Sequence, residues 1–148
     1  MENRNSIFDL LDWNESKERQ EEGVRLALQI NDLSIFIQPC TEKHGKNIWD
    51  NCALILSQKT NEELSPYLPK LLEWIQDLNW PGAEQIMERL SRFDPKELVN
   101  PFISCYTKAV LDEDIMWICW LKELLEKSHL TELLPTKIVD EIKQFVFD

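Results

Sequence analysis

The feature of this sequence that most constrains its fold is the recurrence of prolines and short polar turns at a nearly constant interval. Four prolines follow one another at spacings of 30, 32 and 34 residues: Pro39, Pro69, Pro101 and Pro135. Four short polar turns recur at spacings of 33, 34 and 33 residues, marked by Asp12, Gly45, Asn79 and Asp112. A shared period of this length is typical of repeat proteins, in which one supersecondary unit is stacked on the next. We therefore expect a chain built from about four similar units.

Between these prolines and turns, the apolar residues recur with the period of an α-helix. Residues 68–78 carry apolar side chains at i, i+3, i+4, i+7 and i+10, which is one face of an α-helix. Residues 83–90 repeat that stripe after the turn Asn79-Trp80-Pro81. We expect Pro81 in the first helical turn, where a missing N–H costs nothing, and Asn79 as an acceptor for N–H groups there. The pair predicts an antiparallel helical hairpin.

The other units follow the same plan less regularly. We expect helices within residues 24–30, 49–56, 102–109 and 117–125, and a closing helix at 131–147. Asp112 or Asp114 is expected to cap the helix at 117–125, and Thr60 with Glu63 fits a capping box. No run alternates at period two, so strands are not expected. The fold class predicted is all-α, an α–α superhelix of about four HEAT-like hairpins in one domain, 1–148. The alternative is an ordinary helical bundle.

Charge indicates the kind of partner. The chain has 16 basic and 27 acidic residues, a formal net charge of −11. Such a chain repels nucleic-acid phosphates and anionic membranes and attracts basic surfaces. We therefore expect a basic protein partner, no nucleic acid and no membrane, although net charge also serves solubility alone. The N-terminus lacks the apolar stretch of a signal peptide, which predicts a cytoplasmic protein. The oligomeric state stays open.

Residues that carry chemistry are sparse. No phosphate-binding glycine loop, nucleophile elbow or His-Glu-x-x-His helix occurs. The two histidines, His44 and His129, lie in polar stretches and are expected to be exposed. The four cysteines lack metal-ligand spacing and are expected to be reduced. We therefore expect no catalytic residue, no metal and no cofactor, and a protein that is not an enzyme.

Tryptophan is abundant, with six residues in the chain. We expect most of them in the core, with Trp80 pinning its turn to the hairpin interior. Trp13 and Trp74 are the better surface candidates, and Trp74 stands at the edge of its apolar stripe. Because tryptophan is enriched at binding hot spots, Trp74 is a candidate contact with a partner.

One stretch resembles known families. Residues 69–83 resemble the HEAT-repeat pattern, in which a proline-led helix ends at a short Asp/Asn turn before a second helix. Residues 71–81, LLEWIQDLNWP, resemble the signature LLEWLQDxNWP of an uncharacterised bacterial domain family. Ile75 and Leu78 stand where Leu and Met are expected in members of that family. Members of such families often occur beside toxin–immunity loci, and the resemblance implies no activity.

These observations converge on a binding protein. The leading interpretation is a bacterial immunity or antitoxin-like inhibitor that covers a basic toxin, such as a nuclease. The alternatives are a general protein- or peptide-binding HEAT-like adaptor and, less expected, an enzyme of another type. If equivalent helix faces align along the stack, their acids form one negative stripe. The candidate partner-binding residues are Asp50, Glu73, Trp74, Asp77, Glu84 and Glu88.

Overall fold

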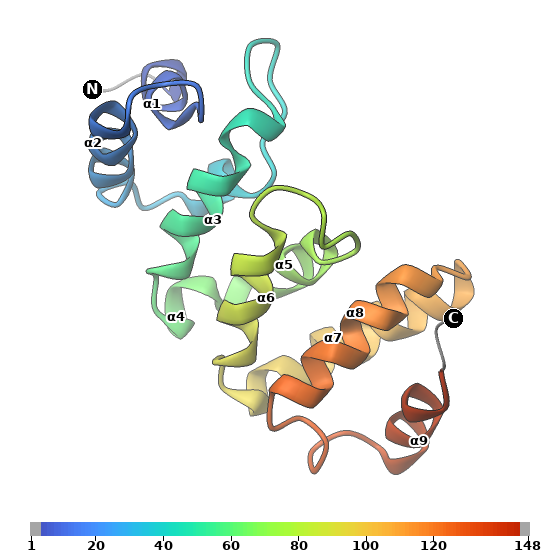
Figure 1. Cartoon of the computed structure of the whole chain (residues 1–148). Helices are drawn as coiled ribbons and strands as arrows, with labels where there is room; N and C mark the ends of the chain where they lie inside the picture. Colours follow the sequence, from blue (N-terminus) through green and yellow to red (C-terminus); the bar gives the residue numbers. More distant parts are fainter. Residues whose placement is uncertain (1–3, 146–148) are drawn as a thin grey trace.

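Helices make up the whole regular structure of residues 4–145, the part of the chain that the computed structural model describes (Figure 1). No β-strand occurs within that range. The α-helices are α1 (Arg4–Leu11), α2 (Lys17–Ala27), α3 (Trp49–Ser57), α4 (Asn61–Leu64), α5 (Leu68–Trp74), α6 (Ala83–Ser91), α7 (Pro95–Leu111), α8 (Ile115–Lys127) and α9 (Thr136–Gln144). Short 3-10 helices are η1 (Leu33–Phe36), η2 (Lys46–Ile48) and η3 (Ser65–Tyr67). The prediction of an all-α fold is confirmed.

The helices stack in two layers along the chain. In one layer α2 packs on α3, α3 on α6 and α6 on α8, while in the other α5 packs on α7. The four helices of the first layer begin at spacings of 32, 34 and 32 residues, at Lys17, Trp49, Ala83 and Ile115. Hairpins join the layers as α1/α2, α5/α6 and α7/α8. In the second unit, η1 and the loop after it stand where the other units have a full first helix. The repeat period in the sequence is therefore the stacking period of the fold.

Side-chain caps fix where several helices begin. Thr60 and Glu63 form the predicted capping box at α4, and Ser65-Pro66 then restarts the chain as η3 and α5. The Asp114 carboxylate accepts the Trp117 N–H at 3.1 Å, as predicted for the start of α8. Each cap satisfies one of the N–H groups that a helix leaves without an intrahelical acceptor.

Several predicted boundaries are wrong. Helix α5 ends at Trp74 instead of residue 78, and α6 begins at Ala83, so Pro81 precedes the helix and does not lie in its first turn. Pro101, read as a mark between elements, lies inside α7, which begins six residues earlier at Pro95. Its ring removes one i→i−4 bond, and the rest of a 17-residue helix absorbs that loss. Helix α1 was not expected, and the predicted contribution of Phe147 to the last helix lies outside the described residues.

One hydrophobic cluster runs through the stack, from Ile7 in α1 to Ile142 in α9. Between the layers, the buried indole N–H of Trp117 in α8 donates to the Leu72 carbonyl of α5 at 3.1 Å. That carbonyl lies in the last turn of α5 and also accepts the Ile75 N–H at 3.3 Å, so the indole is its second donor and links α8 to this helix end. Among residues 4–145, no helix is both long and apolar enough to cross a membrane.

Candidate functional site

Three tryptophans shape the turn between α5 and α6, residues 75–82, which we name the tryptophan turn. Trp74 is fully buried, and its indole Nε1 donates to the Pro81 carbonyl at 3.0 Å. Trp49 of α3 packs edge-on against both Trp74 and Trp80, with ring centroids 6.1 Å apart in each pair. The expectation that Trp74 lies on the surface is wrong. Because α5 stops at Trp74, the chain turns there and residues 77–82 fold back over its ring.

Gly82 closes this turn and was missed by sequence reasoning. Its φ is +83°, in the left-handed region, and it stands at the N-cap of α6 without a side-chain cap. A Cβ placed on it would lie 2.7 Å from the Ala53 Cβ and 2.8 Å from the Trp49 carbonyl oxygen. Only glycine fits there, because both the backbone conformation and the space exclude a side chain. A glycine between a proline and a helix start was the available signal.

The turn and the starts of α3 and α6 enclose a hollow of about 330 Å³. It is lined by Asp50, Leu78, Asn79, Trp80, Pro81, Gly82, Glu84 and Gln85. Asp50 lies in the first turn of α3 and Glu84 in the first turn of α6, and the Gln85 side chain spans the two helices, with its Nε2 3.5 Å from the Asp50 carbonyl. Neither carboxylate forms an ion pair with a described residue. We name this the acidic hollow.

The other predicted acids lie elsewhere or are engaged. Glu73 on α5 pairs with Lys70 at 3.4 Å, and Glu88 on α6 pairs with Arg92 at 3.1 Å. The Asp77 carboxylate accepts the backbone N–H of Asn79 at 2.8 Å. Asp77 thus stabilises the turn. Asn79 was expected to cap α6, but the N-cap of that helix is Gly82. The acidic hollow brings together two of the predicted acids, Asp50 and Glu84.

Arg89 on α6 is a buried cation that the sequence did not reveal. Its Nη2 donates to the Lys59 carbonyl at 2.9 Å and to the Asn61 Oδ1 at 2.6 Å, just past the end of α3. Its guanidinium also lies over the Phe93 ring, 5.4 Å from the centroid. Burial lowers the pKa of Arg89, and the nearby Arg92 adds to that effect. Its acceptors are therefore two neutral oxygens, a carbonyl in the link between α3 and α4 and an amide at the start of α4.

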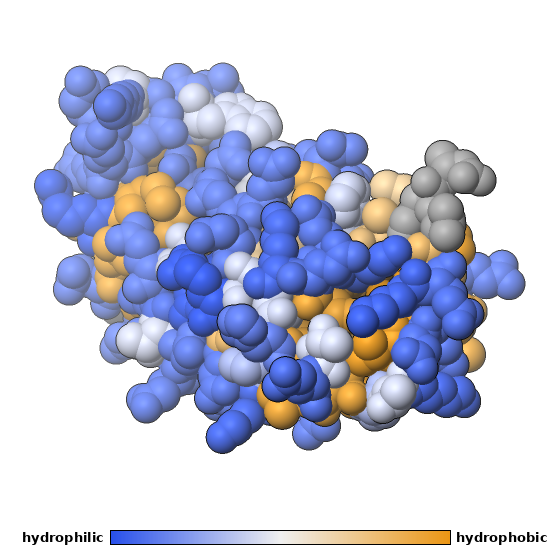
Figure 2. All heavy atoms as spheres, turned by 60° about the horizontal axis from the view of Figure 1, so that its bottom comes forward, coloured by the Kyte–Doolittle hydropathy of each residue, from blue (hydrophilic) through white to orange (hydrophobic). Residues whose placement is uncertain are grey.

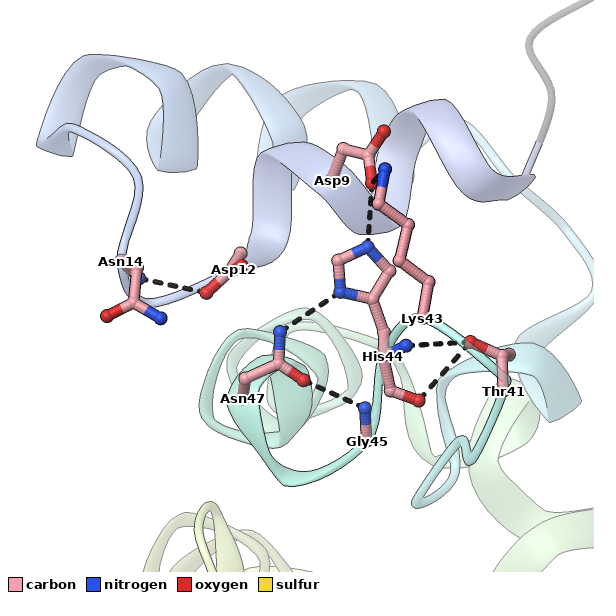
Figure 3. Close-up of polar contacts among 8 residues, drawn as sticks. All are labelled: Asp9, Asp12, Asn14, Thr41, Lys43, His44, Gly45 and Asn47. Atoms are coloured by element: carbon pink, nitrogen blue, oxygen red, sulfur yellow. Dashed lines mark hydrogen bonds and ion pairs between the residues drawn. The ribbon is translucent and has the colours of Figure 1, made fainter.

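His44 lies in a second polar cluster, between α1 and the start of α3 (Figure 3). The residue is only 5% exposed, so the expectation of an exposed loop histidine is wrong, whereas His129 is exposed as expected. The ring Nε2 lies 2.7 Å from the Asp9 Oδ1, and Nδ1 lies 3.0 Å from the Asn47 amide nitrogen. The Lys43 ammonium pairs with the same Asp9 oxygen at 2.9 Å.

The hydrogen bonds around Asn47 determine the tautomer of His44. The Asn47 Oδ1 accepts the Gly45 N–H at 2.8 Å, so its NH₂ group must face the ring. That NH₂ only donates, so Nδ1 is the acceptor and Nε2 carries the hydrogen donated to Asp9. The hydrogen bond from His44, followed by that from Lys43, lowers the pKa of Asp9. Both ring nitrogens are engaged within the protein, and the cluster ties α1 to the loop before α3.

Most of the repeat stack matches one known protein family. A family model described as "Domain of unknown function (DUF5071)" matches residues 45–148. No curated protein and no solved structure matches the chain. The matched segment begins at Gly45, so it contains the tryptophan turn and the acidic hollow but leaves out α1, α2 and His44.

Proposed function

The chain belongs to the DUF5071 family, and we propose that it is a protein-binding domain whose acidic hollow receives a basic side chain of a partner protein. The observation that carries the proposal is the pair Asp50 and Glu84, which face one hollow without a cation from the described residues. Two like charges on one concavity repel each other, and an incoming lysine or arginine relieves that repulsion.

Helix dipoles offer a competing account of these acids. A carboxylate in the first turn of a helix is stabilised by the positive end of the macrodipole, which explains Asp50 and Glu84 separately. The dipole does not explain why both line the same hollow with Asn79 and Gln85, whose amides add donors and acceptors for a polar ligand group. The net charge of −11 favours the binding account further, because it accelerates encounter with a basic partner.

In its specific form, the proposal is a bacterial immunity or antitoxin-like inhibitor that acts in the cytoplasm. A HEAT-like stack would present the acidic hollow to the basic cleft of a toxin, such as a nuclease, and block it. A general adaptor that binds helical peptides is the second candidate, and an apolar groove between α7 and α9 favours it. Neither form needs a catalytic group.

The test is capture of partners by the folded protein and by matched charge variants. Asp50→Lys with Glu84→Lys reverses the acidic hollow, and Glu126→Lys with Glu132→Lys makes the same charge change at exposed positions outside it. We expect a basic protein that is retained by wild type and the control but not by the hollow variant. Its affinity, measured by titration calorimetry, should fall as salt rises.

A neutral variant separates binding from folding. Asp50→Asn with Glu84→Gln removes the charges without adding repulsion at the helix starts, so it should melt close to wild type and still bind more weakly. If every specifically retained protein binds all variants equally, the acidic hollow is not the binding site. If the partner is an enzyme whose activity persists in the saturated complex, the inhibitor form is wrong and the adaptor form stands.

A further inference from the structure

Helix α3 turns one face to solvent, and that face carries an exposed leucine. The apolar residues Cys52, Ala53, Ile55 and Leu56 are fully buried, whereas Leu54 is 39% exposed. Asp50 and Asn51 lie four and three residues before Leu54, so all three side chains fall on the same side of the helix. The outward face of α3 therefore presents an apolar side chain beside two polar ones.

A second hollow adjoins this face, between α2 and α3. It has a volume of about 370 Å³ and is lined by Lys17, Gln20, Glu21, Val24, Asn51 and Leu54. Val24 and Leu54 form its apolar wall. Its charged lining residues, Lys17 and Glu21, approach each other to 4.0 Å and balance in charge. We name this the α2–α3 hollow; its lining suits an apolar side chain of moderate size.

Hydrogen bonds hold the walls of both hollows in place. The Asn51 Nδ2 donates to the Leu11 carbonyl at 2.8 Å and to the Gln20 Oε1 at 3.0 Å, which ties α3 to the α1/α2 hairpin. On the other side of α3, the Gln85 Nε2 lies 3.5 Å from the Asp50 carbonyl. Because the walls are already ordered, a ligand loses little affinity to ordering them.

The two hollows are neighbours across α3. Asp50 lines the acidic hollow, and the next residue, Asn51, lines the α2–α3 hollow. Packed helices lie roughly 8–10 Å apart, so the hollows on the two sides of α3 are separated by about 10 Å. Leu54 lies on the ridge between them, one turn after Asp50. We name the two hollows and this ridge the α3 trough.

Charge differs between the two ends of the α3 trough. Its lining contains three acids, Asp50, Glu84 and Glu21, and one base, Lys17, which approaches Glu21. The end at α6 is therefore acidic, and the end at α2 is balanced and partly apolar. A second copy of the chain would bring no free base from its own trough to the acidic end. A partner with a basic side chain and an adjacent apolar one complements both ends.

Another apolar area, over the C-terminal helices, lacks this charge pattern. Figure 2 shows apolar atoms gathered on that part of the molecule, framed by hydrophilic residues. The hollows between α7 and α9 are lined by one acid, Glu141, and one base, Lys137. Glu141 also accepts the Tyr106 hydroxyl at 2.9 Å. Charge therefore favours no particular occupant there, in contrast to the α3 trough.

We propose that the α3 trough binds one segment of a partner protein, which places a lysine or arginine in the acidic hollow and an aliphatic side chain in the α2–α3 hollow. This binding mode rests on the proposed function, which supplies the basic side chain, and adds the apolar anchor and its position. Side chains about 10 Å apart on one face correspond to positions i and i+7 of an α-helix or i and i+3 of a polyproline II segment. Leu54 contacts the bound segment between its two anchors.

The probe is a library of random dodecapeptides, selected on the full-length wild-type protein. We expect the enriched peptides to share a lysine or arginine and an aliphatic residue at one fixed spacing. The most enriched peptide is then synthesised with a fluorescent label, and its affinity is measured by anisotropy. Replacing its basic residue by glutamine, or its aliphatic residue by serine, should each weaken binding about tenfold or more.

A matched pair of protein variants locates the apolar anchor. Leu54→Ser truncates the leucine of the α3 trough, and Leu133→Ser truncates a leucine of similar exposure, 42%, outside it. We expect about tenfold weaker peptide binding for Leu54→Ser and unchanged binding for Leu133→Ser. The peptide that already lacks its aliphatic residue should lose at least about threefold less on Leu54→Ser, because the two side chains contact each other. Urea unfolding checks that both variants are folded.

The outcomes separate this binding mode from the proposed function. If Asp50→Asn with Glu84→Gln weakens peptide binding but Leu54→Ser does not, the basic side chain is bound and the apolar anchor is wrong. The same holds if the losses from Leu54→Ser and from the truncated peptide simply multiply. If no peptide is enriched, or if the enriched peptides lack a basic residue, both proposals are wrong. A wild-type dimer in sedimentation that dissociates on Leu54→Ser would make a second copy the occupant.

Discussion

Replacement of Gly82 by alanine tests whether the tryptophan turn is built as described. The alanine must adopt φ near +83°, which costs an L-residue roughly 1–2 kcal/mol. Its Cβ would also lie 2.7 Å from the Ala53 Cβ and 2.8 Å from the Trp49 carbonyl oxygen, an overlap of the kind that costs about 1–3 kcal/mol. Reduced freedom of the unfolded chain returns roughly 0.4–1 kcal/mol. We expect Gly82→Ala to lower the free energy of unfolding by about 2–4 kcal/mol.

Equilibrium urea unfolding followed by tryptophan fluorescence is the assay, since Trp49 and Trp74 surround the altered position. The midpoint should fall with an unchanged slope, and the melting temperature should drop by roughly 5–15 °C. Gly45→Ala is the control, because a Cβ at Gly45 meets no atom within 4 Å. It should change stability by less than about 1 kcal/mol.

A double-mutant cycle with Ala53→Gly isolates the steric part. Removing the Ala53 Cβ relieves the shortest overlap with the new side chain, so the two changes together should cost less than their sum, by about 0.5–1 kcal/mol. A Gly82→Ala midpoint equal to that of wild type would refute both the left-handed conformation and the close packing over Gly82.

Three further outcomes follow from the hydrogen bonds described. Trp74→Phe keeps a buried ring but leaves the Pro81 carbonyl without its donor, so the free energy of unfolding in urea should fall by about 1–3 kcal/mol. An unchanged free energy of unfolding would place the indole N–H in solvent. The pKa of Asp9 is lowered in the folded protein, chiefly by the hydrogen bond from His44. The charge of Asp9 therefore stabilises the fold fully above the unfolded pKa near 3.8, and this stabilisation is lost as pH falls through the folded pKa. Asp9→Asn should therefore lower the urea midpoint at neutral pH and flatten its decline in acid; parallel profiles would contradict this. Burial and, after it, Glu141 raise the pKa of Tyr106 to about 12. Glu141→Gln should lower the pKa of Tyr106, measured from tyrosinate absorbance, while burial keeps it above 10. An unchanged pKa would show that Glu141 is not a cause of the shift.

Helix positions were predictable because amphipathic periodicity is local information. The end of α5 was not, since Ile75 and Leu78 still fit the apolar stripe after the helix has stopped at Trp74. The stop depends on contacts absent from that pattern: Asp77 turns the chain, and Gly82 lets it approach α3. Periodicity reports which residues are buried, and in this turn it continues past the last helical residue.

The candidate site was predictable where it follows the repeat. Asp50 and Glu84 each stand second in a first-layer helix, so stacking α3 on α6 brings both to one hollow. Glu88 shares a helix face with Glu84, but the sequence could not show that Arg92 engages it. The burial of His44 was not predictable, because its partner Asp9 is 35 residues away and nothing local announces the pairing.

The two ends of the stack are stiffened by different chemistry. Towards the C-terminus, the Trp117 indole crosses between layers to Leu72, and this neutral bond resists the sliding of one layer over the other at any ordinary pH. At the N-terminus, the tie between α1 and the loop before α3 depends on the charge of Asp9. A two-layer stack bends by summing small rotations between neighbouring units. A pH below the ordinary aspartate pKa of 3.8 is therefore needed to loosen the α1 end, while the Trp117 bond at the α8 end is unaffected.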